Sequence, residues 1–576
     1  MKRKFVQIAA LCLSAVLLTV CVGGQSASAA SSGTSEKVIR VGLHYGTGAM
    51  EGLNLANRTG SGFRFGYYDS SNRFVSLGST AQTAISVVKT VNVYYGTYNG
   101  YTSYHSALTG SAVAVGVYHL QLLGTYSTYE EAQAAAACYE GGFPAYIDGK
   151  FYARVGSYTT EDQAKAAQAA LGTACEIGWT SVYGVSVVVT GTDTIVFQYD
   201  DKGSGTGLGV EPNADGGGEY ITLSKSYLYP GGFRFERING GNMTVVNIVE
   251  FEDYVEGVVA TEMSNGWPVE ALKAQAVAAR SYAVTLGTKH SSYHFDICDG
   301  VDCQAYTGQS RTGSNTKAAV EQTAGQVCLY NGKVAQTFYY SSNGGASESV
   351  SVVWGSNQAS YPYLVGKVDP YEAASGAQND YTKTVSSGTL VAGLKNLGYN
   401  DVGSSIVRVA VTSLTDSGNP KQVTFTDSNG KQFTVNSRYV VSMLGLRSYR
   451  YGFETANGET SASGGTVSAS VNGSAPVDIA GLYAIDGSGN AVPVSGDVYV
   501  LTGSGTAQLG QSGASGGGLG SLSSTTGNNG SFTFIGKGWG HNVGMSQWGA
   551  YAMAKQGYNY REILQFYYTG ITVGFM

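Results

Sequence analysis

The sequence predicts an α+β protein of mixed helices and strands, with a smaller α/β domain inserted toward its N-terminal end. Strand-like alternation appears in runs such as KVIRVGL from residue 37 and MTVVNIVEF from residue 243, with Gly, Ser and Asn turns between runs. Residues 251–450 combine helix-like and strand-like stretches instead of alternating them regularly. This mixture is typical of α+β proteins, whereas regular alternation would indicate a parallel α/β sheet.

The N-terminus has the pattern of a secretory signal peptide over residues 1–29. Basic residues at 2–4 precede an apolar run over 8–22, and Ala-Ser-Ala at 27–29 is a small-x-small cleavage site. We therefore expect export to the extracellular side or the cell wall. Retention of the apolar run as an uncleaved membrane anchor is the alternative, although the run is short for a membrane span.

An internal repeat marks the inserted domain, predicted over residues 112–190. GTYSTYEEAQAAA at 124–136 matches GSYTTEDQAKAAQ at 156–168, at an offset of 32 residues. Each copy follows a strand-like run and has a Ser/Thr cap, acids in the first turn and an Ala-rich helix. The repeat resembles a SPOR domain, which implies binding of glycan strands stripped of stem peptides. A structural repeat without a ligand is the alternative.

The regions around the repeat divide by composition. Residues 30–111 are β-rich, and strands resume after 191, so the repeat interrupts one larger region that extends to 454. Residues 455–530 are dominated by Gly, Ser, Thr and Ala, which predicts a low-complexity surface insertion. Residues 531–576 return to dense motifs and are predicted to complete the larger region.

Composition narrows the class of ligand. Only 13% of the 576 residues are charged and the net charge is −6, so no basic surface for nucleic acid is expected. The 42 tyrosines offer flat apolar rings with hydroxyl groups, which suit uncharged polar ligands such as sugars. Tyrosines also fill ordinary β-rich cores.

A lone acid, Glu262, stands out in EFEDYVEGVVATEM, which predicts a helix from about residue 252. Glu262 falls on one apolar stripe together with Tyr254, Val255, Val258, Val259 and Met263. Burial would raise the pKa of this carboxyl group, as a general acid near neutral pH requires. The alternatives are a structural glutamate paired with a base, or a helix-end residue that turns to solvent.

Arg280 is the matching feature of the next predicted helix, which begins at Pro268. One face of this helix holds Leu272, Ala276, Ala279, Arg280 and Ala283. An unpaired charge on a buried face is costly, so Arg280 requires an anion, either Glu262 or the substrate. A structural arginine at the helix edge is the alternative.

Several long motifs, in order, resemble the stage II sporulation protein D (SpoIID/LytB) family. They are VEGVVATEM with the following helix, CDGVDCQAYTG, TFYYSSNGGASESVSVVWG, YPYLVGKVDPYE, GLRS and GKGWGHNVGMSQWGAYAMAKQGYNYREILQFYYTGI. The resemblance implies a lytic transglycosylase that acts on denuded peptidoglycan strands in sporulation or wall remodelling. It also implies that Glu262 is the essential acid/base and that Arg280 matters for function.

The implied chemistry needs only one carboxylate. Ordinary glycosidases use two, whereas here the MurNAc 6-hydroxyl acts as the nucleophile and closes a 1,6-anhydro ring. Denuded glycan strands are the expected partner, with other wall hydrolases such as amidases. The alternative is a non-catalytic amidase enhancer or cell-wall binding protein.

A candidate metal site lies in HFDICDGVDC, where His294, Cys298 and Cys303 fall within ten residues. Two thiolates and an imidazole suit zinc, with a fourth ligand from elsewhere. Some relatives in the resembled family carry zinc here through a His and two Cys, which favours a structural zinc. A Cys298–Cys303 disulfide is the alternative.

Glycine-rich and aromatic motifs supply the candidate substrate-binding residues. Beside Arg280, these are Gln275, Tyr340, Ser342, Asn343, His541 and Gln547. Glycines let a sugar chain approach closely, and these side chains offer hydrogen bonds or stacking. Structural roles are the alternatives: His541 fixing its loop, Gln547 in a first helical turn, and Asn343-Gly344 as an ordinary turn.

Overall fold

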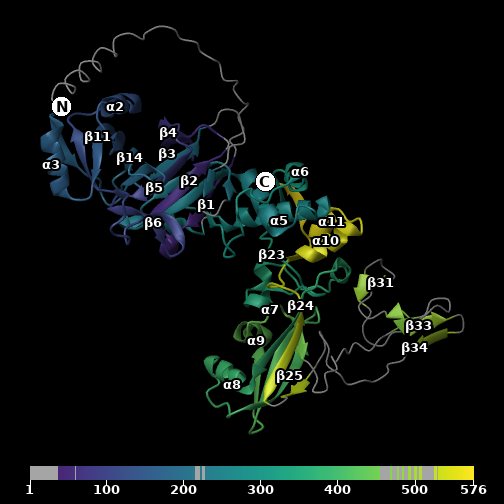
Figure 1. Cartoon of the computed structure of the whole chain (residues 1–576). Helices are drawn as coiled ribbons and strands as arrows, with labels where there is room; N and C mark the ends of the chain where they lie inside the picture. Colours follow the sequence, from purple (N-terminus) through teal and green to yellow (C-terminus); the bar gives the residue numbers. More distant parts are fainter. Residues whose placement is uncertain are drawn as a thin grey trace. The chain divides into compact units, whose positions relative to one another are not determined.

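The computed structural model divides into two compact units, which we describe separately (Figure 1). Unit 1 comprises the residues up to Glu262 together with 286–312, and unit 2 comprises 263–285 and 313–576. The residues described are 37–58, 60–213, 221–223, 227–287, 289–453, 524–527 and 530–576, with short strands between 468 and 508. The predicted signal peptide and most of the predicted 455–530 insertion lie outside this set. Helices and strands are mixed, which confirms the α+β class.

The first sheet of unit 1 has seven strands and positions both α4 and the cysteine motif. Its order is β20 (Ile297–Cys298), β1 (Val38–His44), β19 (Thr244–Glu250), β18 (Gly232–Glu236), β15 (Leu208–Pro212), β3 (Phe63–Tyr68) and β4 (Phe74–Thr80). Strand β1 pairs antiparallel with β19 and parallel with β20. Helix α4 (Phe251–Glu262) begins directly where β19 ends.

The predicted repeat forms part of a second, ten-stranded sheet in unit 1. Neighbouring strands at one end of this sheet come from the repeat, in the order β12 (Cys175–Gly178), β9 (Tyr118–Leu122), β11 (Lys150–Tyr158) and β10 (Gly142–Ile147). The order continues through β14 (Ile195–Asp200), β13 (Val185–Val189), β5 (Ala84–Lys89), β2 (Gly52–Asn57), β16 (Ile221–Leu223) and β17 (Leu228–Tyr229). A smaller sheet contains β7 (Tyr101–His105), β6 (Val93–Tyr98) and β8 (Ala114–Val115).

Both helices of the repeat begin at the predicted caps. Thr128 precedes α2 (Tyr129–Ala136) and Thr160 precedes α3 (Glu161–Leu171), and each side chain accepts a hydrogen bond from a first-turn N–H. The helices add Ala136 and Ala164 to a core with strand residues such as Leu120. The result is the βαββαβ arrangement of ferredoxin-like folds. Its sheet is not free-standing, because β10 pairs in parallel with β14 and β13 pairs with β5.

Unit 2 is built from small sheets and helices. The sheets are β22 (Lys333–Val334), β21 (Gln326–Tyr330) and β38 (Thr572–Phe575); β23 (Tyr339–Tyr340) and β37 (Met545–Ser546); β24 (Asp380–Ser386), β36 (Ser531–Lys537) and β28 (Arg450–Phe453); and β27 (Gln432–Asn436), β26 (Pro420–Asp427), β25 (Ile406–Leu414) and β35 (Ser524–Thr526). The α-helices are α5 (Val269–Leu286), α6 (Ser314–Gln322), α7 (Val350–Trp354), α8 (Ser387–Asn396), α9 (Ser437–Leu444), α10 (Gln547–Lys555) and α11 (Tyr560–Tyr567).

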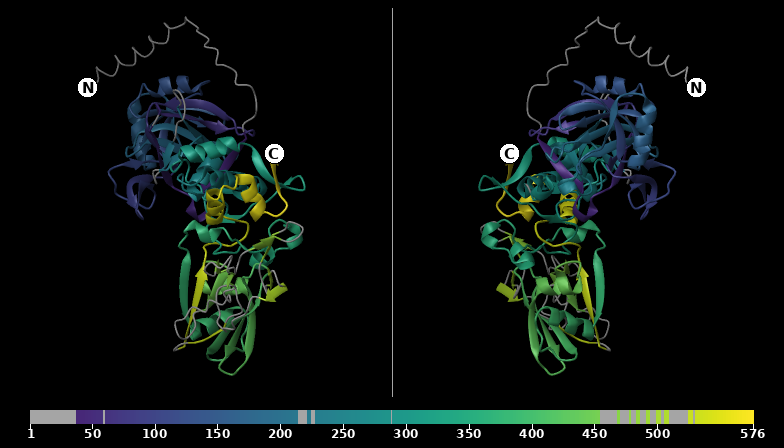
Figure 2. Two further views of the ribbon diagram at one scale, coloured as in Figure 1. Left: turned by 90° about the vertical axis from the view of Figure 1, so that its right-hand side faces the viewer. Right: turned by 90° about the vertical axis from the view of Figure 1, so that its left-hand side faces the viewer.

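The C-terminal residues complete unit 2. Strand β36 lies between β24 and β28, as the yellow strand beside the green ones shows in Figure 2. Phe532 and Phe534 of this strand are buried in a core with Phe425 and Leu390. Three two-stranded hairpins pair β29 (Ser468–Ala469) with β30 (Val477–Asp478), β31 (Tyr483–Ile485) with β32 (Ala491–Pro493), and β33 (Tyr499–Thr502) with β34 (Gly505–Gln508).

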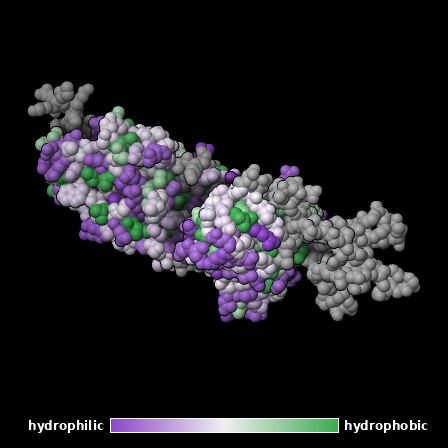
Figure 3. Space-filling model, turned by 90° about the horizontal axis from the view of Figure 1, so that it is seen from below, coloured by the Kyte–Doolittle hydropathy of each residue, from purple (hydrophilic) through white to green (hydrophobic). Residues whose placement is uncertain are grey.

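Apolar residues on the surface are dispersed. The face drawn in Figure 3 shows hydrophobic residues scattered among hydrophilic ones. Exposed large apolar side chains include Leu123, Trp179, Val301 and Trp539. Within the described residues, no helix combines the length and apolar character needed to cross a membrane.

Candidate functional site

Glu262 is the last residue of α4 in unit 1. The predicted apolar stripe is present, because Tyr254, Val255, Val258 and Val259 have no exposed surface. Glu262 itself is only partly buried, so the stripe does not enclose it. The side chain therefore stays within reach of a ligand from solvent.

The end of α4 is fixed closely by its neighbours in unit 1. Gly257 faces Tyr306, and a Cβ at this position would lie 2.6 Å from the Tyr306 ring. The Thr261 hydroxyl donates to the Gly257 carbonyl at 2.8 Å and lies 2.9 Å from the Thr307 hydroxyl. The turn of helix that carries Glu262 is thus held by both packing and hydrogen bonds.

A group of possible metal ligands lies at the end of β20, also in unit 1. The donor atoms of His290, Cys298, Asp302 and Cys303 all lie within 4.8 Å of one another. The Cys303 sulfur is 3.3 Å from Nε2 of His290. Both cysteines are buried and free, so the disulfide alternative is absent from this structure.

The two thiols differ in acidity. Hydrogen bonds from the Cys303 thiol, the Gly300 backbone and the Tyr45 hydroxyl lower the pKa of Cys298 to about 5. The same contact with Cys298, together with burial, raises the pKa of Cys303. One thiolate is therefore already favoured before any metal binds, and thiolate is the form that coordinates zinc.

His294, the predicted third ligand, is not part of this group. Its Nδ1 lies 2.7 Å from Oε1 of Glu236, and His290 takes the place by the cysteines. The reason is the short turn Ser291–Tyr293, which ends with His294 in the left-handed region at φ 62° and redirects the chain. The prediction from sequence named His294 and missed both His290 and Asp302.

The corrected donor set fits zinc. Two sulfurs, an imidazole and a carboxylate are four donors of the kinds that zinc accepts in tetrahedral sites. Donor atoms around such an ion lie roughly 3.5 Å apart, from bond lengths of about 2.0–2.3 Å. The separations here require only a modest contraction.

Arg280 is buried in α5 of unit 2, as predicted, and residues 274–281 of this helix are buried on every side. Leu272, Ala276, Ala279 and Arg280 are fully buried, and Ala283 is nearly so. Nη1 of Arg280 donates to the carbonyl of Gln326 at 2.9 Å. This bond ties α5 to β21 and gives the guanidinium at least a structural role.

Two predicted substrate-binding residues have unmet hydrogen-bonding groups. Gln275 is fully buried, and among the described residues neither its amide nitrogen nor its amide oxygen has a hydrogen-bond partner. The buried hydroxyl of Tyr340 also lacks a partner within the same set. Each such group costs about 1–3 kcal/mol, so a bound water or ligand is expected to complete it.

Ser342 and Asn343 instead use their hydrogen bonds inside unit 2. Ser342 donates to Glu372, and Asn343 donates through its side chain to Asp369 at 2.6 Å and through its backbone to Glu372 at 2.8 Å. Burial raises the pKa of Glu372, while donors including Ser546 favour its carboxylate. Asp369 and Glu372 were not predicted, although two acids in one motif of a weakly charged chain were a usable signal.

His541 and Gln547 lie where the structural alternatives placed them: His541 bonds within its own loop, and Gln547 is in a first helical turn. Nδ1 of His541 accepts the Val543 N–H at 3.1 Å, and the ring packs against Tyr340 and Trp354. Burial lowers the pKa of His541 to about 4, so the ring is neutral at pH 7. Gln547 is buried in the first turn of α10.

An exposed aromatic surface accompanies these residues. Trp354 is 42% exposed and Trp539 is 52% exposed. The guanidinium of Arg447 lies 4.6 Å from the ring centre of Trp539 and supports one face of the indole. Exposed indole rings of this kind can stack on sugar rings.

Comparison with known proteins finds one matching family model and several similar proteins. Residues 239–330 match the family described as Stage II sporulation protein. A protein named Amidase enhancer from Bacillus subtilis is 32% identical, over 55% of this chain and 40% of its own length. Stage II sporulation protein D from the same organism is 27% identical, over 58% of this chain and 76% of its own length. An uncharacterised protein of Brachyspira hyodysenteriae is 28% identical, over 58% and 68% respectively.

Proposed function

We propose that this chain, whose residues 239–330 match the family described as Stage II sporulation protein, is a cell-wall lytic transglycosylase. The observation that carries the proposal is Glu262, a partly exposed acid at the end of the apolar stripe of α4, within the matched segment.

Glu262 would act first as an acid and then as a base. As the acid, it protonates the glycosidic oxygen between MurNAc and GlcNAc while the C1–O bond breaks. As the carboxylate, it takes the proton of the MurNAc 6-hydroxyl, whose oxygen bonds to C1 and forms the 1,6-anhydro ring. No water is consumed, and Glu262 ends protonated as it began. Strands lacking stem peptides are the proposed substrate.

Residues of unit 2 are proposed to bind the glycan. Gln275 and Tyr340 carry hydrogen-bonding groups without partners among the described residues, so they are suited to a polar ligand. Arg280 and His541 would act mainly by positioning, since Arg280 bonds to the Gln326 carbonyl and His541 to the Val543 N–H. Gln547, in the first turn of α10, is assigned the same role. Ser342 and Asn343 are assigned a supporting role through Glu372 and Asp369.

His290, Cys298, Asp302 and Cys303 are proposed to hold a structural zinc ion. When bound, zinc would stabilise the segment that follows α5 and would supply no step of the reaction. The reaction proposed for Glu262 needs no activated water, so a hydrolytic metal is not required.

The test is cleavage of purified denuded glycan by the full-length protein, with products identified by mass spectrometry. Glu262→Gln is expected to lower formation of anhydro ends by about 10³-fold, since acid/base groups contribute about 10²–10⁴-fold. Glu256→Gln, the same change on the same partly buried helix, is the matched control and should cleave normally. Cleavage that survives Glu262→Gln would overturn the assignment.

A second candidate function is suggested by the relative named Amidase enhancer. In that case the chain would bind the wall and stimulate a separate amidase without cleaving glycan. The same preparations decide between the two functions. If wild type and Glu262→Gln stimulate an added amidase equally and neither forms anhydro product, the enhancer function is favoured.

A further inference from the structure

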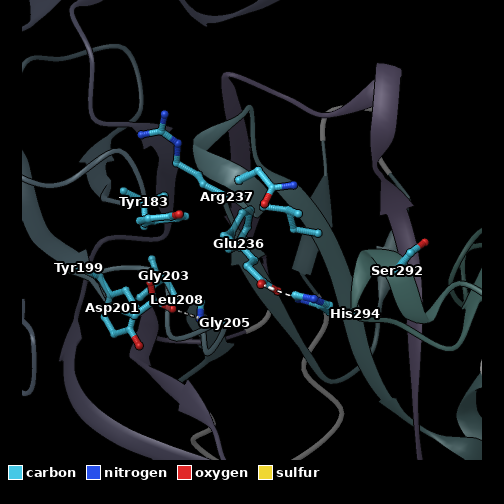
Figure 4. A pocket seen from close by; sticks show the side chains of 15 residues that line it. Tyr183, Tyr199, Asp201, Gly203, Gly205, Leu208, Glu236, Arg237, Ser292 and His294 are labelled. Carbon is cyan, nitrogen blue, oxygen red and sulfur yellow. Dashed lines mark hydrogen bonds and ion pairs between the residues drawn. The ribbon is translucent and has the colours of Figure 1, made fainter.

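Unit 1 contains a cavity that shares no residue with Glu262 or the cysteine group. Its volume is about 240 Å³, and Figure 4 shows the side chains around it. The walls come from Tyr183, Tyr199 of β14, the glycine-rich loop 201–207, the end of β18 at Glu236, and the turn at Ser292 and His294. The cavity is thus built by segments that follow β12, the last strand of the repeat, in the chain.

His294 is held rigidly at this cavity. Its Nδ1 is 2.7 Å from Oε1 of Glu236 (Figure 4). Its backbone carbonyl also accepts a hydrogen bond from Arg234. Glu236 is buried, and its Oε2 lies 3.7 Å from Nη2 of Arg234. His294 also adopts the left-handed region, which costs energy for a non-glycine residue.

Because Nδ1 of His294 is bonded to Glu236, Nε2 is the ring nitrogen that faces a ligand. A carboxylate on one imidazole nitrogen sets the orientation of the ring and the role of the second nitrogen. The His294 side chain is 47% exposed, whereas Glu236 behind it is 6% exposed. A buried carboxylate that orients an exposed imidazole is an arrangement suited to binding.

The loop of the cavity is also preformed. Asp201 accepts hydrogen bonds from the backbone N–H groups of Gly203, Thr206 and Gly207. Gly203 has φ 87°, and a Cβ there would lie 2.8 Å from the Tyr183 ring. Only glycine lets the loop run this close to the tyrosine.

Charge selects the kind of ligand. The Arg237 guanidinium is occupied by the carbonyls of Gly184, Gly240 and Gly241. Arg234 is likewise occupied by His294 and Glu236. Arg237 keeps its positive charge on the walls beside the carboxylates of Asp201 and Glu236, and these carboxylates are already bonded to backbone N–H groups and to His294. The charges of the described walls therefore largely offset one another and favour an uncharged ligand.

Size and aromatic lining narrow the ligand further. A volume of about 240 Å³ is below the 300–1,000 Å³ that is usual for drug-sized ligands, and it suits a single sugar ring. Tyr183, which is partly exposed, offers flat apolar surface, and His294, Ser292 and Asn239 offer polar groups. A second hollow of about 290 Å³ shares Tyr199 and Asp201, so a longer chain could continue from the cavity.

We propose that this cavity binds one uncharged N-acetylhexosamine ring of a glycan. It would thereby anchor the strand at a second point, separate from the catalytic residue. The inference rests on the proposed function, which makes glycan the substrate. Of the two alternating sugars, MurNAc carries a carboxylate and GlcNAc does not. The cavity therefore selects GlcNAc, with His294 hydrogen-bonded to a hydroxyl or amide and Tyr183 against the ring.

The experiment measures binding of N,N′-diacetylchitobiose to full-length protein carrying Glu262→Gln, by titration calorimetry and ligand-observed NMR. His294→Asn removes the imidazole but keeps a residue that tolerates positive φ, and Ser292→Trp fills the mouth from an exposed position. Each is expected to weaken binding at least about tenfold, the loss of one good hydrogen bond or of access. Tyr439→Ala, at an exposed tyrosine of unit 2, is the control and should bind normally.

Three outcomes overturn the inference. One is unchanged chitobiose binding by both His294→Asn and Ser292→Trp. Another is tighter binding of free MurNAc than of GlcNAc, and the third is tighter binding of cationic glucosamine than of GlcNAc. Cleavage by protein that retains Glu262 separates the two proposals. Anhydro products without binding in the cavity contradict only this inference. Binding in the cavity without anhydro products contradicts only the proposed activity.

Discussion

Four polar residues, two in each unit, differ in how far they are exposed to solvent. In unit 2, Ser342 and Asn343 are buried and bonded to Glu372 and Asp369. In unit 1, Glu262 is partly exposed, and His294 presents half of its side chain to solvent. Residues of the first kind hold loops in place, while residues of the second kind are available to a ligand. Predicted site residues can therefore be sorted by their partners.

The largest effect outside catalysis is expected at the metal group. His290→Ala should reduce zinc content from about one ion per chain to near zero, because it removes one of four donors. His294→Ala is the matched change four residues away and should leave zinc in place. Metal analysis of the purified proteins measures both, and loss of zinc in His294→Ala alone would restore the ligand predicted from sequence.

Asn343→Ala is expected to destabilise the protein by about 2–4 kcal/mol. The change leaves Asp369 buried without one of its donors, and it removes the acceptor of the Gly345 N–H. Thermal or urea unfolding would measure the loss. Asn400→Ala, at an exposed position, is the control with an expected change within about 0.5 kcal/mol. A loss of glycan binding with unchanged stability would instead place Asn343 among the ligand-binding residues.

His541 should make stability depend on pH. Burial lowers its pKa to about 4 in the folded protein, below the ordinary value near 6.5. Between these values the unfolded chain takes up a proton and the folded protein does not, so stability falls as pH decreases from 6.5 to 4. Comparing melting temperatures of wild type and His541→Phe at pH 7 and pH 5 tests this: the wild type should lose more. Equal losses would contradict a neutral, buried ring.

The smallest effect is predicted for Gln275→Met. Removing an amide without partners among the described residues should be neutral or stabilise by about 1 kcal/mol. If the amide binds glycan, KM should rise even though the melting temperature does not fall. A destabilised variant with unchanged KM would show that the amide serves the fold.

Sequence reasoning was most successful where a property depends on neighbouring residues. The stripe of α4, the burial of Arg280 in α5 and the caps at Thr128 and Thr160 all follow from local periodicity and capping, and all are confirmed. The choice between His290 and His294 depends on one left-handed residue after a short turn, which no spacing reveals. The roles of Asp369 and Glu372 depend on residues about 30 to 200 positions away in sequence. Such partners are set by tertiary structure alone.

The pairing of β1 has a consequence for how the protein folds. Its neighbours β19 and β20 lie more than 200 residues later in the chain, and Arg40 is joined to Asp296 across 256 positions. Contacts of such sequence separation form slowly, because a long loop must close first. While the chain is being made, β1 has an unpaired edge that is open to wrong partners until residue 298 has emerged. The first strand of the described chain thus waits for more than 200 further residues before it can pair, and any factor that shields it in the meantime should raise the yield of folded protein.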